Sequence, residues 1–407
     1  MIARTLSFAL CGALLCACTS APPSAQLPTQ APAAALVAAP ATAAPALAVT
    51  PLPRTTAATA IATAAAIATV AAKPTAIPAD GPAIPSLTRK LLLATPPLRG
   101  EDVGLLQRRL TDLGYKLGTA DTIYGKRTES AVRAFQALSG ALIDGVVGDE
   151  TWGLLFAADA PRYDLHPIVD PRDGSLIGAA SGDRWIDAER IAEIVLPQPY
   201  RLLLQESGVA AATAQGSAAR VGDVPCEQSR YIELSGAGVE TALLAAGGTL
   251  ETLPRQVTAV PTDSAELQRP AAQALRALGV ATDTVQVTGA LRADLDDDGK
   301  QETVFTATYR ASGAEGPQPS AAAGDYSAVL LLPDGEQTAT VITADVITKA
   351  VDFGAPYQFV LRGVWDLNGD GMFEVVIDSS YYEGASVDVY TVDGVASQSV
   401  LVAGCGV

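Results

Sequence analysis

The sequence has few of the side chains on which metalloenzymes and nucleic-acid-binding proteins depend. Among its 407 residues, His166 is the single histidine, and five are cysteines. A zinc peptidase needs several such ligands, so His166 alone excludes that kind of site. Neither Cys226 nor Cys405 has a histidine near it in the sequence, which argues against a cysteine nucleophile. With 27 basic against 44 acidic residues and a net charge of -17, no nucleic-acid partner is expected.

The N-terminus has the pattern of an export signal. Arg4 precedes an apolar stretch at residues 6–15, which is too short to span a bilayer. The string LCAC at residues 15–18 resembles the bacterial lipobox, whose final cysteine is acylated. We therefore predict a lipoprotein signal peptide at residues 1–17 and a lipid anchor on Cys18 that holds the exported chain on a membrane. An ordinary signal peptide that contains cysteines is the alternative.

Only Cys226 and Cys405 then remain for redox chemistry, because Cys11 and Cys16 leave with the signal. Export places them where a disulfide persists. A bridge between them closes a loop of about 180 residues and stabilises the fold by roughly 4–5 kcal/mol in the chain-entropy model. Two unpaired buried thiols are the alternative.

Residues 18–90, after the signal, are almost wholly Ala, Pro, Thr, Val and Leu. Proline favours extended, solvated backbone over a packed core, so we predict a disordered linker that follows the lipidated Cys18.

Residues 91–160 have the periodicity of a small three-helix domain. Apolar residues recur at helical spacing within residues 101–113 and 131–138, and a third short helix is expected at 149–156. Gly114 and Gly140 offer C-terminal stops for the first two.

Three strings in this segment resemble the peptidoglycan-binding-domain-like family: VGLLQRRLTDLGY from residue 103, DTIYGKRT from 121 with AVRAFQ from 131, and DGVVGDETWGLL from 144. The last repeats the turn and helix of the second at a spacing of 23 residues. The resemblance implies a domain that binds the glycan or stem peptide of the bacterial wall, with peptidoglycan as the partner.

The repeated polar residues have structural roles as well as potential binding roles. Asp121 and Asp144 can accept hydrogen bonds from turn amides, and Thr128 and Thr151 fall in first helical turns. Thr122 replaces the glycine of the usual Asp-Gly turn. Tyr115, Tyr124, Lys126 and Arg127 are expected to be exposed and to offer stacking faces or positive charge. The predicted peptidoglycan-binding residues are Tyr115, Asp121, Tyr124, Lys126, Arg127, Thr128, Asp144 and Thr151.

Residues 161–407 predict a β-rich (α+β) domain, with residues 161–225 as a potential separate lobe. Helices are expected at 187–195, ended by Pro197, and at 270–278, beginning at Pro270. Many short runs of β-branched and aromatic residues lie between Gly, Asp and Pro, and these predict strands.

Two acidic loops in this region share the pattern DxDxDGxxE: DLDDDGKQE at residues 294–302 and DLNGDGMFE at 366–374. The spacing brings carboxylates onto one cation and therefore predicts structural calcium. An EF-hand does not fit, because Phe305 and Ile377 occupy position twelve. The loops resemble those of integrin-type FG-GAP or VCBS repeats; a metal-free turn is the alternative. The predicted ligands are Asp294, Asp296, Asp298, Glu302, Asp366, Asn368, Asp370 and Glu374.

From these features we expect a lipoprotein of the cell envelope that performs no catalysis, binds peptidoglycan, and presents a calcium-stabilised β-domain to a protein or carbohydrate ligand. Two alternatives remain open. One is a peptidoglycan hydrolase that acts through carboxylates of the β-domain. The other is a structural spacer between membrane and wall.

Overall fold

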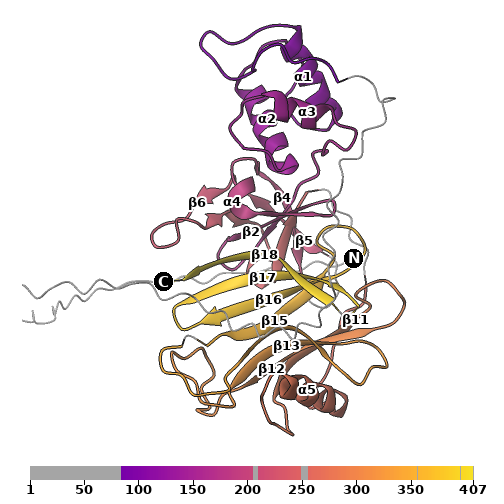
Figure 1. Ribbon diagram of the computed structural model, residues 1–407, viewed down its shortest axis with the longest axis vertical. Helices are drawn as coiled ribbons and strands as arrows, with labels where there is room; N and C mark the ends of the chain where they lie inside the picture. Colours follow the sequence, from indigo (N-terminus) through magenta and orange to yellow (C-terminus); the bar gives the residue numbers. More distant parts are fainter. Residues whose placement is uncertain (1–83, 205–209, 249–254, 355, 395, 407) are drawn as a thin grey trace, which may run out of the picture. The chain divides into compact units, whose positions relative to one another are not determined.

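The computed structural model of the chain describes residues 84–204, 210–248, 255–354, 356–394 and 396–406 (Figure 1). The predicted signal peptide, Cys18 and most of the predicted linker lie outside these residues. The described part has a helical domain followed by a β-rich region, as the sequence predicted. The structure adds that the sheets are antiparallel and do not close into a barrel. None of its helices is long and apolar enough to cross a membrane.

The helical domain contains the three expected helices. Leu106, Leu110 and Phe135 have no exposed surface and form its centre. Gly114 ends the first helix with a φ of +90°, and the next amide, that of Tyr115, donates to the carbonyl of Leu110 at 2.9 Å. The helices are α1 (Glu101–Asp112), α2 (Lys126–Ser139) and α3 (Asp149–Phe156).

The 23-residue repeat is visible in the backbone of the two turns that precede α2 and α3. Thr122 has a φ of +61°, and Gly145, its equivalent 23 residues later, has a φ of +71°. A threonine in this left-handed region costs about 1–2 kcal/mol relative to glycine. The turn therefore keeps its geometry although the usual glycine is absent.

The first part of the β-rich region forms a seven-stranded sheet with the order β3-β2-β1-β9-β4-β5-β8. This sheet extends to Gly247, beyond the potential lobe limit at residue 225, because β9 inserts between β1 and β4. The strands are β1 (His166–Val169), β2 (Leu176–Ser181), β3 (Arg184–Asp187), β4 (Gln198–Leu203), β5 (Ala210–Gly216), β8 (Leu234–Ser235) and β9 (Leu244–Gly247), with a separate hairpin of β6 (Arg220–Val221) and β7 (Arg230–Tyr231) and the 3-10 helix η1 (Val239–Thr241).

The helix predicted at residues 187–195 is much shorter than expected. Only α4 (Ala188–Ile191) forms, because Asp187 belongs to β3 and pairs with Gly178 of β2. After Ile191 the chain makes a turn, in which the amides of Ile194 and Val195 both donate to the carbonyl of Ile191. Sheet pairing has therefore taken Asp187 from the predicted helix, and a turn replaces its second half at residues 192–195.

Two further sheets follow, each a meander of consecutive strands. The five-stranded sheet runs β10-β11-β12-β13-β14 and the four-stranded sheet runs β15-β16-β17-β18. Their strands are β10 (Thr258–Ala259), β11 (Val287–Ala293), β12 (Glu302–Tyr309), β13 (Tyr326–Leu332), β14 (Thr340–Val346), β15 (Gln358–Trp365), β16 (Glu374–Tyr381), β17 (Gly384–Asp393) and β18 (Ala396–Gly406).

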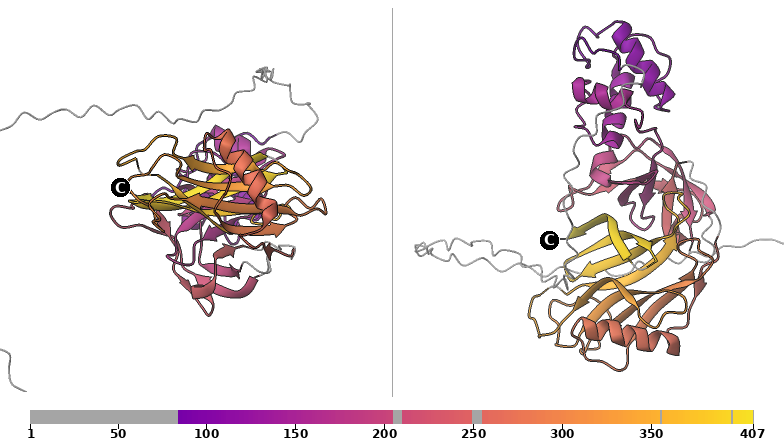
Figure 2. Two further views of the ribbon diagram at one scale, coloured as in Figure 1. Left: turned by 90° about the horizontal axis from the view of Figure 1, so that it is seen from below. Right: turned by 45° about the vertical axis from the view of Figure 1, so that its right-hand side comes forward.

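The helix on the five-stranded sheet, α5 (Ala265–Ala277), starts earlier than predicted. Pro270 was expected to begin it but lies inside it, buried on the apolar face with Leu267 and Ala271. The missing amide of Pro270 removes one hydrogen bond near the start of the helix, and burial against the sheet offsets this loss. Figure 2 shows α5 on one face of the sheet.

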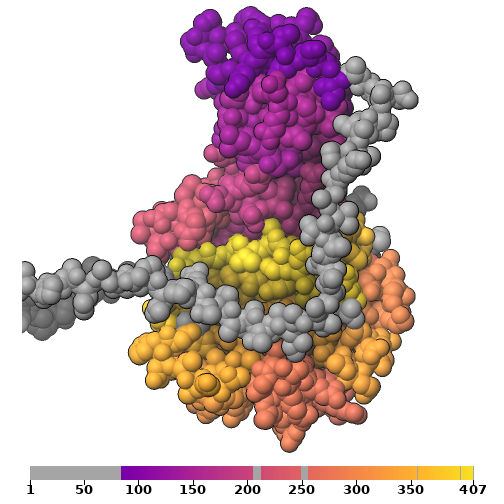
Figure 3. Space-filling model, viewed as in Figure 1, coloured from indigo at the N-terminus to yellow at the C-terminus, as the bar shows by residue number. Residues whose placement is uncertain are grey.

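The faces of the sheets are joined by separate apolar clusters. Phe305 and Ala307 of β12 pack with α5, whereas Val304 points to the opposite face and packs with Phe359 of β15. On the other face of the four-stranded sheet, Trp365 packs with Ile168 of the seven-stranded sheet. The four-stranded sheet, yellow in Figure 3, therefore lies between the other two.

The helical domain shares its apolar core with the outer face of the seven-stranded sheet, since Tyr115 and Phe135 belong to the same cluster as Val169. Polar contacts reinforce this junction. The guanidinium of Arg190 donates to the carbonyls of Gln136, Ala137 and Ala141 at 2.8–3.0 Å. The carbonyls of Gln136 and Ala137 are among the last of α2, which have no partner within the helix, and Ala141 follows the helix. The helical domain is thus bonded to the β-rich region.

Candidate functional site

A buried glutamine organises the first repeated turn of the helical domain. The Nε2 group of Gln107 donates to the Oδ1 of Asp121 at 2.9 Å, to the carbonyl of Ile123 at 3.1 Å and to the Oγ1 of Thr128 at 3.0 Å. Its Oε1 accepts from the amides of Asp121 and Thr122. One side chain therefore saturates the polar groups of the turn.

Gln136 forms the equivalent hydrogen bonds in the second turn. Its Nε2 donates to the Oδ1 of Asp144 at 2.8 Å and to the Oγ1 of Thr151 at 3.3 Å, and its Oε1 accepts from the amide of Gly145 at 2.9 Å. Thr151 is only 6% exposed. The polar repeat predicted from the sequence is thus an internal hydrogen-bond network, and its central glutamines were not singled out in the sequence.

Two residues expected to be exposed are buried. Tyr115 and Tyr124 are 2% and 0% exposed, and both contribute to the apolar core. Their hydroxyls donate to the carbonyls of Pro161 and Gly145. The expectation of exposed stacking faces is therefore wrong, because both rings pack into the apolar interior while their hydroxyls find carbonyl partners.

Lys126 and Arg127 are exposed at the start of α2. They occupy the first two positions of the helix, where unbonded amides add a partial positive charge. Asp121 lies in the preceding turn, and the hydrogen bond from Gln107, followed by that from the Ile123 amide, lowers the pKa of its carboxyl. These three predicted binding residues are exposed at this surface, and Asp144, which accepts from Gln136, is exposed in the second turn.

The first acidic loop connects β11 to β12 and brings three predicted ligands together. One carboxylate oxygen from each of Asp294, Asp296 and Glu302 lies within 4.8 Å of the others. The Oδ1 of Asp294 is buried and has no hydrogen-bond partner. Asp298 differs, because its carboxylate pairs with Lys300 Nζ at 2.6 Å.

The second loop, between β15 and β16, repeats the hydrogen bonds of the first. The amide of Leu367 donates to Glu374 Oε2 at 2.7 Å, as the amide of Leu295 does to Glu302 Oε2 at 2.9 Å. In this loop Asn368 Nδ2 donates to Asp370 Oδ2 at 2.9 Å, so these two predicted ligands contact each other. In the part of the chain that the structure describes, the three-carboxylate arrangement occurs in the first loop alone.

The two loops are neighbours although 72 residues separate them in the sequence. The amide of Phe373 donates to the carbonyl of Leu295 at 2.7 Å. Arg255 donates to the carbonyls of Asp294 and Gly371 and lies 5.0 Å from the ring centroid of Phe373. The five- and four-stranded sheets are thus fastened together at this end.

The acids of the loops are electrostatically strained. Burial raises the pKa of Asp366 and of Glu302, and it raises the pKa of Glu374 well above its ordinary value. Neighbouring carboxylates act in the same direction, Asp370 on Glu374 and Asp296 on Glu302. A bound cation is one way to relieve this repulsion.

A second polar cluster was not predicted and joins the seven- and four-stranded sheets. Arg362 of β15 is 5% exposed and pairs with Asp170 at 2.9 Å and, more closely, with Asp378. Arg172 also pairs with both aspartates, at 2.8 and 2.7 Å. Asp170, Arg172 and Asp378 line a cavity of about 510 Å³. Burial raises the pKa of the Asp378 carboxyl to about 6, although Arg172 acts to lower it.

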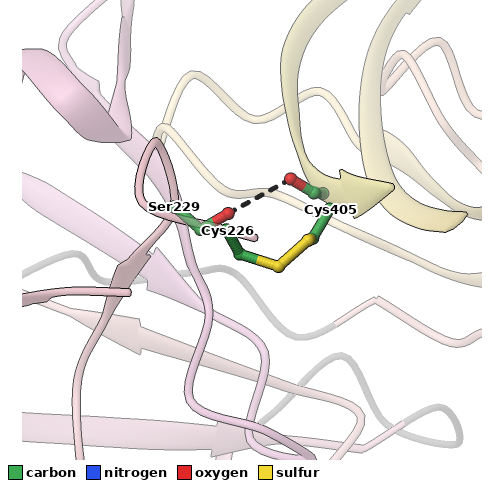
Figure 4. Close-up of a disulfide and its surroundings, with 4 residues drawn as sticks. Cys226, Ser229 and Cys405 are labelled. Atoms are coloured by element: carbon green, nitrogen blue, oxygen red, sulfur yellow. Dashed lines mark hydrogen bonds between the residues drawn. A yellow bond between two sulfur atoms is a disulfide. The ribbon is translucent and has the colours of Figure 1, made fainter. Parts of the chain in front are cut away.

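The predicted disulfide borders this cavity. Cys226, in the turn between β6 and β7, is bonded to Cys405 of β18, and their Cα atoms are 5.6 Å apart (Figure 4). Beside it, the Ser229 hydroxyl donates to the carbonyl of Gly404 at 3.2 Å. The bridge connects positions 179 residues apart, as the sequence predicted.

Comparison with known proteins identifies the class of the helical segment. Residues 99–155 match the family described as "Putative peptidoglycan binding domain", which confirms the predicted domain. The chain is 42% identical over 60 residues to the N-acetylmuramoyl-L-alanine amidase CwlM of Mycobacterium tuberculosis (strain ATCC 25618 / H37Rv), a match that spans 15% of each protein. A solved structure, the L,D-transpeptidase (residues 123–326) from Xylanimonas cellulosilytica DSM 15894, is 24% identical and covers 38% of this chain and 91% of its own, with a TM-score of 0.20.

The match to the amidase corrects one expectation. That relative is named as an enzyme, and this finding contradicts the inference that the chain performs no catalysis. That inference depended on the lack of histidine and of Cys-His pairs. The number of histidines and cysteines argues against zinc and cysteine mechanisms. It does not bear on catalysis by carboxylates, for which the chain has 44 acidic residues.

Proposed function

We propose that this chain is a peptidoglycan-binding protein of the cell envelope, whose helical domain holds the β-rich region at the wall. The observation that carries the proposal is the match of residues 99–155 to the peptidoglycan-binding family. Cys18 is proposed as the lipid anchor of the exported chain, and the predicted linker that begins at residue 18 as the tether that lets the domain reach the wall. The last part of that linker, predicted to extend to residue 90, is packed on the helical domain instead, because the Pro85 carbonyl accepts from Trp152 Nε1 at 2.6 Å and Arg89 pairs with Asp102 at 2.7 Å.

The proposed contact surface is the start of α2. Lys126 and Arg127 are exposed there, and the remaining predicted residues are largely engaged in the glutamine networks. The wall polymer carries carboxylates, so two adjacent cations at a helix N-terminus can pair with it. Because the domain shares its core with the seven-stranded sheet, the test uses the full chain.

Replacing Lys126 and Arg127 together by alanine is expected to weaken binding to purified sacculi about tenfold, as the loss of about 1.4 kcal/mol of charge-assisted contacts predicts. Co-sedimentation over a range of protein concentrations measures the affinity. The matched control replaces Lys349 and Arg269, which are exposed in the β-rich region. Gln107→Leu serves as a second comparison, since it should lower binding and melting temperature together. Unchanged sedimentation of the double variant contradicts the proposed surface.

We also propose that the first acidic loop binds calcium as a structural ion. The residues present fit such an ion, because three carboxylates converge and the buried Asp294 Oδ1 has no partner. Calcium prefers carboxylate and carbonyl oxygens of this kind. The second loop offers Asp366, Asp370 and Glu374 with Asn368, and its deeper burial is consistent with a role in holding the sheets together.

Calcium at about 100 times its Kd is expected to raise the melting temperature by roughly 5 °C, since such binding stabilises by about 2.7 kcal/mol. Asp294→Asn keeps an oxygen acceptor for the amide of Gly299 but removes the charge, so this variant should lose most of the increase. In chelator the two proteins should melt together. Asp334→Asn, an equal change at an exposed position, is the control. A wild-type melting temperature that calcium does not change contradicts the proposed calcium site.

A second candidate function is hydrolysis of wall glycan, and the specific observation is the cavity that contains Asp170 and Asp378. A carboxyl with a pKa of about 6 is protonated at mildly acidic pH, where it can protonate a leaving oxygen while a second carboxylate acts on the opposite side.

Purified protein should then release reducing ends from sacculi, and Asp378→Asn should reduce this rate at least about 100-fold. The acid must be protonated to act, so the rate should fall as the pH rises through about 6. Asp173→Asn, an exposed acid at the same cavity, is the control. Absence of any soluble product from the wild-type protein excludes this candidate and leaves wall binding untouched.

A further inference from the structure

A second cavity of about 500 Å³ lies between β11, β12 and the start of β15, and Arg310 is one of its walls. Alternation along β12 explains the position. Phe305 and Ala307 face α5, so Thr306, Thr308 and Arg310 face β15. The cavity is therefore on the inner face of the sandwich, in the β-rich region and outside the peptidoglycan-binding domain.

Arg310 is buried without a counter-ion. It is 7% exposed, and its Nη2 donates to the carbonyl of Tyr357 at 2.8 Å. Its Nε and Nη1 are buried and have no hydrogen-bond partner. Among the residues that the structure describes, Arg310 takes part in no ion pair. Asp325, which is also buried, directs its two carboxylate oxygens to the amides of Ala311 and Ala322 instead.

Arg362 shows how this same protein compensates a buried guanidinium. It is 5% exposed, comparable to Arg310, and it pairs with two aspartates. An ionised group taken out of water without a partner costs several kcal/mol. Arginine cannot avoid this cost by losing its proton, because its pKa is too high. The open nitrogens of Arg310 are thus suited to an anion that arrives from outside the chain.

The other residues that line the cavity indicate which further chemical groups the anionic ligand carries. Thr288 and Thr308 supply hydroxyls, Gln286 and Gln358 supply amides, and Phe359 supplies an apolar face. A volume of this size accommodates a small molecule rather than a single atom. Glu315 at the exposed rim, together with the net charge of -17, disfavours ligands with several negative charges. The cavity therefore offers one cation, Arg310, and several neutral hydrogen-bonding groups. This combination suits a ligand that has one carboxylate together with hydroxyl or amide groups.

We propose that this cavity binds a small monocarboxylate that carries hydroxyl or amide groups, with its carboxylate paired to the fork of Arg310. The planar guanidinium matches a carboxylate with two parallel hydrogen bonds. Because Nε and Nη1 are screened from solvent, binding requires a local movement of the cavity wall that exposes them. This proposal is independent of wall binding by the helical domain.

The test titrates the full chain with acetate, D-lactate and N-acetylmuramic acid in a buffer free of carboxylate and phosphate. Inorganic phosphate and the neutral N-acetylglucosamine serve as comparison probes. At about 100 times its Kd, the best carboxylate should raise the melting temperature by roughly 5 °C, and calorimetry should show one site. The two comparison probes should bind at least about tenfold more weakly.

Three variants separate binding from folding. Arg310→Met should abolish the carboxylate response and, without ligand, melt no lower than the wild type, because an uncompensated buried charge is gone. Arg310→Lys keeps the charge but loses the fork, so its Kd should rise at least about tenfold. Thr288→Val removes one lining hydroxyl and its hydrogen bond to Thr306, and it should weaken binding several-fold while lowering the melting temperature by at most about 4 °C. Arg276→Met, on the exposed side of α5, is the control with an unchanged response.

Two results overturn the proposal. One is a wild-type melting temperature that none of the carboxylates raises. The other is a carboxylate response that persists in Arg310→Met or, if that variant does not fold, in Arg310→Lys with unchanged affinity. Either result leaves the sedimentation of the protein with sacculi as it was, so failure here is distinguishable from failure of the proposed function.

Discussion

Replacing Arg362 by methionine is expected to lower the free energy of unfolding by about 3–5 kcal/mol, the usual cost of removing one partner from a buried ion pair. The side chain is 2% exposed and holds Asp170 and Asp378, which come from different sheets. Without it, Asp170, itself 2% exposed, keeps only the partly exposed Arg172 as a cation. Urea denaturation at neutral pH measures the change.

Two further variants make this result specific to the buried charge. Arg172→Met removes the same group from a side chain that is 56% exposed and should cost less than about 1 kcal/mol. Combining Arg362→Met with Asp170→Asn and Asp378→Asn removes all the buried charges and should restore most of the lost stability. If Arg362→Met and Arg172→Met are equally stable, the cluster does not hold the sheets together.

Breaking the disulfide is expected to have an effect of similar size. In the chain-entropy model, a loop closed by residues 179 apart stabilises the fold by about 5 kcal/mol. The double variant Cys226→Ser and Cys405→Ser should therefore unfold at a much lower urea concentration than the wild type under non-reducing conditions. Cys226 and Cys405 are partly exposed, so a reductant reaches the bridge without prior unfolding.

The matching control is the reduced wild-type protein, which should unfold at the same urea concentration as the double variant. Ser229→Ala, which removes the adjacent hydrogen bond to Gly404, should cost no more than about 1 kcal/mol. If reduction leaves the unfolding midpoint unchanged, the bridge does not constrain the unfolded chain as this prediction requires.

Much of the helical domain was predictable because its information is local. The spacing of Leu106 and Leu110 marks the buried face of α1, and the glycine after each of the first two helices marks its end. The repeated Asp and Thr positions gave the two turns. What local patterns missed was the pair of glutamines, since only the folded turns show that Gln107 and Gln136 face inward.

The β-rich region was predicted less completely because its contacts are distant in sequence. Most strands of the two meanders lie where β-branched runs occur, as in β12 and β16. The helix predicted at residues 187–195 is shortened because Asp187 pairs with β2 and because the chain turns after Ile191, and helical periodicity records neither feature. The start of α5 was misplaced because burial of Pro270 outweighs its missing hydrogen bond.

The sequence by itself determined the three helices of the helical domain, the turn repeat, the acidic loops and the pairing of two cysteines, because each depends on residue type at short spacing or on a count. Only the tertiary structure decided which charged groups are buried and whether each has a partner. Arg310 and Arg362 are the same residue type in the sequence. Folding places Asp170 and Asp378 beside Arg362, whereas no aspartate among the described residues lies within hydrogen-bond distance of Arg310. Removal from water is what makes that difference costly, and water is removed only when the sheets pack.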